Sequence, residues 1–553
     1  MTRKTLTIMA MLLCTCLIIG LAGCTPKAPD PQGELSAHDD MESIIRFGRD
    51  WPTYIDPGVG SSYTCQVAHA NLYDPLVFPN TDGTVRPHVA SEWTVSEDGL
   101  TYTFKIRQDI KFHSGNLLKA SDVAFSMNRL LTIGEGFSHL YHGVVKECYA
   151  PDDETVVMEL NYTFGPFANS LVRFYILEED LVMANIDKSV DTYGEYGDYG
   201  KTWLLTNDAG SGPYKVKEVR LEEYVMGERF DDYFLGWEEN APKNFMVTNL
   251  NDPVAQRTAF ANKELEIARD NLPQETYAEI EKMGGLVVTK SATGGWNMML
   301  NTKNAPTDCV YFRKALAYAF DYDTLVASIL PGSAKSTGPV ASVLFGKNHD
   351  LPGYEYNLDK AREMLSKSKY ANDPDKWFVS LAWCAEVPEQ EKMSLMFQAS
   401  LKELGITLEI TKTPFSVMTA NAQTIETTPN ASIVLWSPSF LEAGDVFKSR
   451  YHSASTGSWE QMEWLLDEEL DAMIDDALST VDNDERGRKY RAIEEYIFDL
   501  CPTIWMCAND SKFAVQPYVE WPIATYYKEN VPALMPGGFD LYFRDCKVFL
   551  DKK

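Results

Sequence analysis

The sequence lacks the motifs of the common enzyme classes. It contains no Gly-x-Ser-x-Gly and no His-Glu-x-x-His. It also has no complete Gly-x-x-x-x-Gly-Lys-Ser/Thr phosphate-binding loop, because Glu195 stands where Gly200-Lys201-Thr202 would need the first glycine. It also has no Cys-x-x-Cys, so nothing supports a structural zinc or a thioredoxin-like site. We therefore expect no catalytic residues, no metal and no cofactor. Without a nucleophile–base pair, a binding protein is favoured over a hydrolase.

Basic residues are scarce relative to acidic ones. The 553-residue chain has 50 Lys and Arg against 80 Asp and Glu, which gives a formal net charge of -30. Such a surface repels phosphate backbones, which excludes nucleic acid as the main partner. Hydrophobic residues make up 45% and aromatic residues 12%, as is typical of a packed globular protein. At roughly 150 residues per domain, the length predicts about three or four structural units.

Only one run is apolar enough to suggest a membrane segment, and it lies at the N-terminus. A basic start precedes an uncharged apolar run over residues 6–21, which is short for a spanning helix. The run ends in Leu21-Ala22-Gly23-Cys24, which resembles the bacterial lipobox, where the chain is cut before an acylated cysteine. We expect a lipoprotein signal peptide over residues 1–23, lipidation at Cys24 and a flexible tether over residues 24–43. A plain secretory signal is the alternative.

The remaining cysteines say little about function. Their number is odd, so at least one is unpaired, and most are expected to be buried small apolar residues. One or two disulfides stay open as a possibility. The seven are Cys65, Cys148, Cys309, Cys384, Cys501, Cys507 and Cys546.

Patterns typical of strands and of helices are mixed along the rest of the chain. Residues 100–107 alternate apolar and polar side chains after a good turn at Asp98-Gly99, so residues 91–107 are predicted to form a hairpin. Ser121 is expected to cap the helix that follows, and Asn357 is expected to cap another. The mixture predicts α/β lobes rather than a helical bundle or a β-sandwich.

The order of these motifs resembles a known family. The chain is similar to the extracytoplasmic solute-binding proteins of the peptide/nickel class, which include the oligopeptide- and dipeptide-binding lipoproteins of bacterial ABC importers. The most specific stretch is residues 87–123, with Ser91-Glu92-Trp93-Thr94-Val95-Ser96-Glu97-Asp98-Gly99 at its centre. Gly210-Ser211-Gly212-Pro213-Tyr214 matches a second family block, and residues 301–321 match a third. The resemblance covers residues 44–553.

The resemblance implies an α/β periplasmic-binding-protein fold. Two lobes are joined by a hinge, one lobe carries an extra inserted domain, and the ligand is enclosed between the lobes. The expected divisions are lobe I (first part) over 44–78, the inserted domain of lobe I over 79–205, lobe I (second part) over 206–295, lobe II over 296–504, and the C-terminal part of lobe I over 505–553.

The resemblance also implies ligand-binding positions. In peptide-binding relatives the aspartate of a Trp-x-x-Asp pattern receives the amino end of the peptide. Here Trp436 opens the pattern, and Ser439 stands at the aspartate position. A hydroxyl cannot make the same charge-assisted contact, so Asp445 is a candidate substitute, with a loop or cap role equally open. The other expected ligand-binding residues, with lobe packing as the alternative for most of them, are Phe440, Trp51, Tyr54, Phe137, Tyr141, Trp296 and Asn297.

The function implied is that of a lipid-anchored, monomeric receptor on the outer side of the cell membrane, at the cell surface or in the periplasm. It would deliver a peptide-like solute to ABC permease and ATPase subunits. An oligosaccharide receptor of the same fold is an alternative, because the chain has 12 Trp and 28 Tyr that could stack on sugar faces. A non-transport sensory binding protein is another. The family also includes binders of nickel complexes and of haem.

Overall fold

The computed structural model describes residues 43–553 except 271, 291, 509–510 and 530–532. The predicted signal peptide, the predicted lipidation at Cys24 and residues 24–42 of the tether lie outside the described residues. Across the ranges that are described, no helix is both long and apolar enough to cross a membrane.

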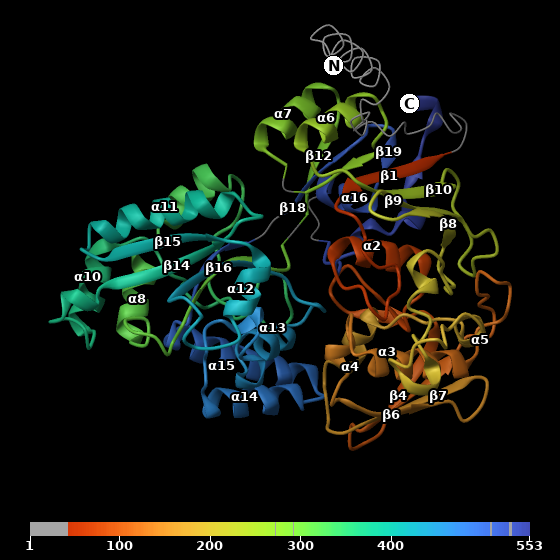
Figure 1. The fold of residues 1–553 in the computed structure, drawn as a ribbon, viewed down its shortest axis with the longest axis horizontal. Helices are drawn as coiled ribbons and strands as arrows, with labels where there is room; N and C mark the ends of the chain where they lie inside the picture. The colour runs from red at the N-terminus through yellow and green to blue at the C-terminus, as the bar shows by residue number, and fades with distance from the viewer. Residues whose placement is uncertain (1–42, 271, 291, 509–510, 530–532) are drawn as a thin grey trace, which may run out of the picture. The chain divides into compact units, whose positions relative to one another are not determined.

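Lobe I is built on a seven-stranded mixed sheet (Figure 1). Its order is β12-β18-β11-β1-β10-β9-β8, with β1 parallel to both of its neighbours and the other pairs antiparallel. The strands therefore come from distant parts of the chain. They are β1 (Ile44–Arg49), β8 (Tyr214–Arg220), β9 (Tyr224–Arg229), β10 (Asn244–Asn249), β11 (Ile267–Ala268), β12 (Leu286–Lys290) and β18 (Ser511–Val515). The helices of this lobe are α2 (Tyr63–Leu72), α6 (Pro253–Ala261), α7 (Gln274–Lys282) and α16 (Pro522–Lys528), and two small ribbons are β2 (Val77–Pro79) with β3 (Val85–Pro87) and β19 (Val519–Glu520) with β20 (Lys547–Val548).

The inserted domain has a four-stranded antiparallel sheet in the order β4-β5-β7-β6. The predicted hairpin is confirmed, because β4 and β5 pair across a turn in which Asp98 accepts the Leu100 N–H and Gly99 has φ +69°. The predicted cap at Ser121 is wrong. The helix begins at Ala120 and its N-cap is Lys119, two residues before Ser121, and Asp122 accepts the Lys119 N–H at 2.9 Å. The elements are β4 (Ala90–Val95), β5 (Thr101–Ile106), β6 (Val145–Tyr149), β7 (Thr155–Leu160), α3 (Ala120–Ile133), α4 (Phe167–Ser170) and α5 (Glu179–Ala184).

Lobe II has a five-stranded mixed sheet in the order β15-β14-β16-β13-β17, with α11 packed on β14 and β15 (Figure 1). The predicted cap at Asn357 is confirmed by its side-chain oxygen, which accepts the Lys360 N–H at 3.0 Å. The strands are β13 (Gly295–Leu300), β14 (Phe378–Cys384), β15 (Thr407–Thr413), β16 (Ala431–Trp436) and β17 (Thr503–Ala508). The helices are α8 (Val310–Ala319), α9 (Tyr322–Thr324), α10 (Leu358–Lys367), α11 (Glu389–Lys402), α12 (Phe415–Asn421), α13 (Ala443–Arg450), α14 (Glu468–Leu478) and α15 (Asn483–Leu500).

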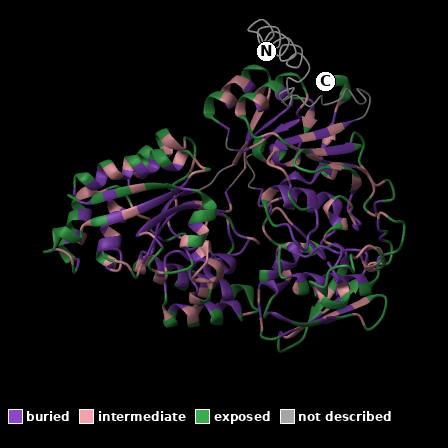
Figure 2. Cartoon of the chain, viewed as in Figure 1, coloured by how far each residue is buried: buried purple, intermediate pink, exposed green. Residues whose placement is uncertain are grey.

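The chain passes between the two large sheets twice, from β12 to β13 and from β17 to β18. The expected division between residues 504 and 505 falls within β17. Buried residues dominate the strands, whereas exposed residues line the outer helices (Figure 2). The seven described cysteines are free and buried, as expected of small apolar side chains.

Candidate ligand-binding site

The segment from the end of β16 to the start of α13 carries four of the predicted site residues. Trp436 ends β16 and is only 5% exposed. The Arg450 guanidinium lies 5.7 Å from the Trp436 ring centroid, and the Trp436 side chain hydrogen-bonds Glu460. Trp436 is thus held by two partners from its own lobe, which fix the orientation of its ring.

Ser439 and Asp445 contact each other across the start of α13. The Ser439 N–H donates to Asp445 Oδ2 at 2.5 Å, so Asp445 holds the shape of the loop. Burial raises the pKa of Asp445 to about 7, and the charge of Glu460 adds to this shift. The Ser439 N–H and the charge of Arg173 oppose it. At neutral pH this carboxyl is therefore only partly charged.

Arg173, which the sequence patterns did not single out, contacts the predicted ligand-binding segment. It ends a 3-10 turn (Leu171–Arg173) of the inserted domain and is only 2% exposed. Its Nε donates to the Ser439 carbonyl at 2.8 Å, and its Nη1 donates to the Gly537 carbonyl at 2.7 Å. Three distant parts of the chain therefore meet at one guanidinium. The available signal was a lone charged residue within the apolar run 171–177.

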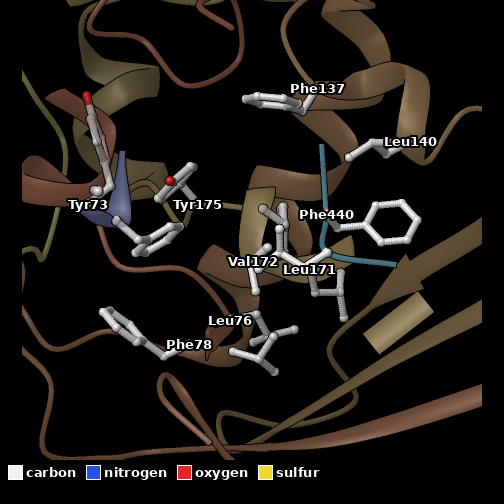
Figure 3. Close-up of a cluster of buried hydrophobic side chains, with 14 of the residues drawn as sticks. Tyr73, Leu76, Phe78, Phe137, Leu140, Leu171, Val172, Tyr175 and Phe440 are labelled. Carbon is white, nitrogen blue, oxygen red and sulfur yellow. The ribbon is translucent and has the colours of Figure 1, made fainter. Parts of the chain in front are cut away.

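Several predicted aromatic residues share one buried cluster. Phe137, Tyr141 and Phe440 belong to it, and the Tyr141 hydroxyl donates to the Ser170 carbonyl at 2.8 Å. Figure 3 shows Phe440, which lobe II contributes, with Leu171 and other side chains of the first lobe and its inserted domain. The Arg173 guanidinium lies 5.0 Å from the Phe137 ring centroid. An aromatic ring of the cluster thus lies close to the charged group.

The other predicted residues are spread more widely. Trp51 packs partly buried against the same cluster, whereas Tyr54 is 39% exposed. Trp296 belongs to the separate core of lobe II, and the Asn297 side chain donates to the Gly295 carbonyl at 2.7 Å. The structure therefore places Phe137, Tyr141, Ser439 and Asp445 close to Arg173. Trp436 and Phe440 share a buried cluster with Phe137 and Tyr141, whereas Trp296 lies in a different core.

The inserted domain and lobe II also touch beside this site. The Gly165 N–H donates to the Leu478 carbonyl at 2.7 Å, and the Asn169 amide donates to Glu442 Oε2 at 3.0 Å. Glu442 is fully buried and also accepts from Arg486 Nε at 2.6 Å. These contacts fix how closely the two parts approach.

A polar pocket of about 520 Å³ lies elsewhere, on lobe II. Asn304, Ser380 and Asn430 are among its lining residues, and the Asn430 amide is already bonded to the Ala305 carbonyl and to Thr307. None of the predicted site residues lines it. Over the described residues, no group of three or more His, Cys, Asp or Glu side chains could hold a metal ion.

Sequence comparison decides the family. Residues 84–458 match the profile of the bacterial extracellular solute-binding proteins, family 5 Middle. The chain belongs to this family. Its members are solute-binding components of ABC importers in the peptide/nickel class and not enzymes, so the predicted resemblance is confirmed.

Individual relatives agree with this assignment. The probable D,D-dipeptide-binding periplasmic protein DdpA of Escherichia coli K12 is 25% identical over 483 residues, which cover 85% of this chain and 89% of the relative. The crystal structure of the ABC transporter substrate-binding protein CtaP of Listeria monocytogenes has a TM-score of 0.78 at 21% identity and covers 92% of this chain and 99% of its own. The periplasmic binding protein DppA of Helicobacter pylori, in complex with the peptide STSA, has a TM-score of 0.73 at 20% identity, with coverage of 92% and 99%. The predicted periplasmic-binding-protein fold is confirmed.

The raised pKa of Asp445 predicts a pH dependence of stability. An aspartate in the unfolded chain has a pKa of about 3.9, so between about pH 4 and pH 7 the folded protein binds more protons at this site than the unfolded chain. The contribution of Asp445 to stability therefore falls as the pH rises through this window. An Asp445→Asn variant keeps an acceptor for the Ser439 N–H and does not titrate. The free energy of unfolding of the variant minus that of the parent protein should therefore be about 2 kcal/mol larger at pH 8 than at pH 5.

Urea unfolding of the two proteins at both pH values measures this difference directly, because other titrating groups are common to both. A stability difference that is the same at pH 5 and pH 8 would contradict the raised pKa.

Proposed function

We propose that this protein is the lipid-anchored solute-binding component of a bacterial ABC importer. It captures a peptide-like solute between its lobes outside the cytoplasm and delivers it to the permease. The lipobox at Cys24 supports the anchor, and the family match supports the role in import. A lipid anchor keeps the receptor close to the permease while the binding body stays in the aqueous phase.

The similarity to peptide-binding proteins supports a peptide-like solute. The name of DdpA assigns it a D,D-dipeptide, and the DppA structure contains a bound peptide. The proposed ligand-binding residues are those named from the sequence, centred on Trp436 and Ser439, with Arg173 added. Enclosing a solute between lobes removes water from its polar groups and strengthens each contact with it.

A thermal-shift screen of the purified protein tests the proposal. The panel contains di- and tripeptides, oligosaccharides and nickel chelates. A solute that binds only the folded state raises the unfolding midpoint. At a solute concentration of a hundred times Kd, the free energy of unfolding increases by about 2.7 kcal/mol. We expect peptides to raise it and the other two classes to leave it unchanged. A response to oligosaccharides alone, or to nickel chelates alone, would replace the peptide-like solute with that class.

A further inference from the structure

Among the described residues, no carboxylate pairs directly with the charge of Arg173. Arg129 and Arg450 are equally buried, but each pairs with a carboxylate, with N–O distances of 2.6 and 2.8 Å. Arg173 forms no ion pair with any described residue. It donates to two neutral backbone carbonyls and also interacts with the neutral side chain of Tyr175. Burying a charge without a partner costs free energy, so a buried charge in a protein is normally paired with a group of opposite charge.

The ionisable groups around Arg173 leave this charge unbalanced. The hydroxyls of Tyr141 and Tyr175 are neutral, because burial raises the pKa of both. Burial and the charge of Arg173 hold the pKa of His69 at about 4, so its ring is neutral as well.

The two nearby carboxyls are already engaged. Asp540 on the C-terminal side binds Lys290 Nζ at 2.6 Å and the Tyr63 hydroxyl at 2.8 Å. Asp445 on the lobe II side accepts the Ser439 N–H and is only partly ionised. The pKa of Arg173 is lowered by its burial, which shows that these neighbours do not fully offset the loss of water.

The position of Arg173 suits a ligand contact. Its guanidinium joins the inserted domain to Ser439 of lobe II, where the predicted ligand-binding segment lies. The two carbonyl contacts use two of its five N–H groups, and the interaction with Tyr175 engages a third, which leaves two for a ligand. By comparison, all three nitrogens of the buried Arg313 donate to carbonyls within lobe II. Arg313 is thus a structural residue, whereas Arg173 keeps donor capacity where two parts of the protein meet.

We propose that Arg173 binds a carboxylate of the solute, so that the solute presents an anionic group, and not an ammonium, to the Ser439 end of the site. The planar guanidinium matches the geometry of a carboxylate and forms strong charge-assisted hydrogen bonds with it. Because Ser439 stands where peptide-binding relatives have an aspartate, this position carries no negative charge that would repel a carboxylate. This inference rests on the proposed function and specifies the charge of the solute that the site accepts.

Three forms of one dipeptide test the inference. Alanyl-phenylalanine has both charged ends, its N-acetyl form keeps only the carboxylate, and its C-terminal amide keeps only the amine. Calorimetric titration should give a Kd for the N-acetyl form at least tenfold lower than for the amide. Arg173→Gln should weaken binding of the N-acetyl form by about tenfold to a hundredfold and leave the amide unchanged. Arg173→Lys, which keeps the charge, should retain part of the preference.

Arg313→Gln is the matched control, since it removes another buried guanidinium that donates to carbonyls. It should lower the unfolding midpoint but keep the preference for the N-acetyl form. Preference for the amide in the parent protein, or an unchanged preference in a folded Arg173→Gln variant, overturns the carboxylate contact and leaves the proposed function standing. No binding of any of the three forms contradicts both the carboxylate contact and the peptide-like solute.

Discussion

An Asp56→Ala variant is expected to lose about 3–5 kcal/mol of folding stability, because it leaves Arg129 charged and unpaired in the interior. Arg129 Nη1 and Nη2 donate to the two carboxylate oxygens of Asp56 at 2.8 and 2.6 Å. Only 1% of the arginine side chain and 3% of the aspartate side chain are exposed. The pair ties the segment after β1 in lobe I to α3 of the inserted domain, so its loss removes a connection between two parts of the fold.

Urea unfolding measures the loss, and a surface pair provides the control. Arg107 and Asp109 form a similar contact at 2.7 Å, but 34% and 58% of their side chains are exposed. Asp109→Ala should therefore cost less than about 1 kcal/mol. The double variant Asp56→Leu, Arg129→Leu should be more stable than Asp56→Ala, because no buried charge is left without a partner. Similar losses in Asp56→Ala and Asp109→Ala would show that burial does not govern the strength of the Asp56 pair.

Local features of this fold could be predicted because a few neighbouring residues determine them. The turn at Asp98-Gly99 needs only a side-chain acceptor and a glycine that tolerates a positive φ. The Asn357 cap needs only an acceptor three residues before a free N–H. Ser121 failed as a cap because Asp122 reaches back to the Lys119 N–H and starts the helix earlier. When two residues that can cap a helix are adjacent, the sequence alone does not show which of them determines where the helix begins.

The arrangement of the site could not be predicted in the same way. Arg173 contacts residues that are 266 and 364 positions away, and no sequence spacing encodes such a contact. The family resemblance located the segment that begins at Trp436 and revealed the replacement of the aspartate by Ser439. It did not reveal a cation opposite that position. Nor did it show that Asp445 is committed to the Ser439 N–H, because that contact depends on how α13 begins.

A Gly165→Leu variant is expected to keep the lobes folded but to prevent the inserted domain from approaching lobe II as it does in this structure. A Cβ atom at Gly165 would lie 2.2 Å from the Thr480 carbonyl oxygen and 3.1 Å from the carbonyl carbon. Both are backbone atoms, which cannot rotate away as the end of a side chain can. The φ angle of Gly165 is not positive, so its own backbone accepts a larger residue without strain. The steric clash therefore weakens the contact between the inserted domain and lobe II and does not strain the backbone at position 165.

If solute binding needs this approach, the variant should bind N-acetyl-alanyl-phenylalanine at least about tenfold more weakly, because part of the binding energy would have to displace the new side chain. Calorimetric titration measures the affinity, and small-angle X-ray scattering measures the expected increase in the radius of gyration. Gly143→Leu is the control: a Cβ there meets nothing within 4 Å, although its φ of +76° strains the substituted residue. Unchanged affinity in Gly165→Leu would mean that the contact of Gly165 with Leu478 and Thr480 is not part of solute capture, and that the lobes can enclose a solute without touching there.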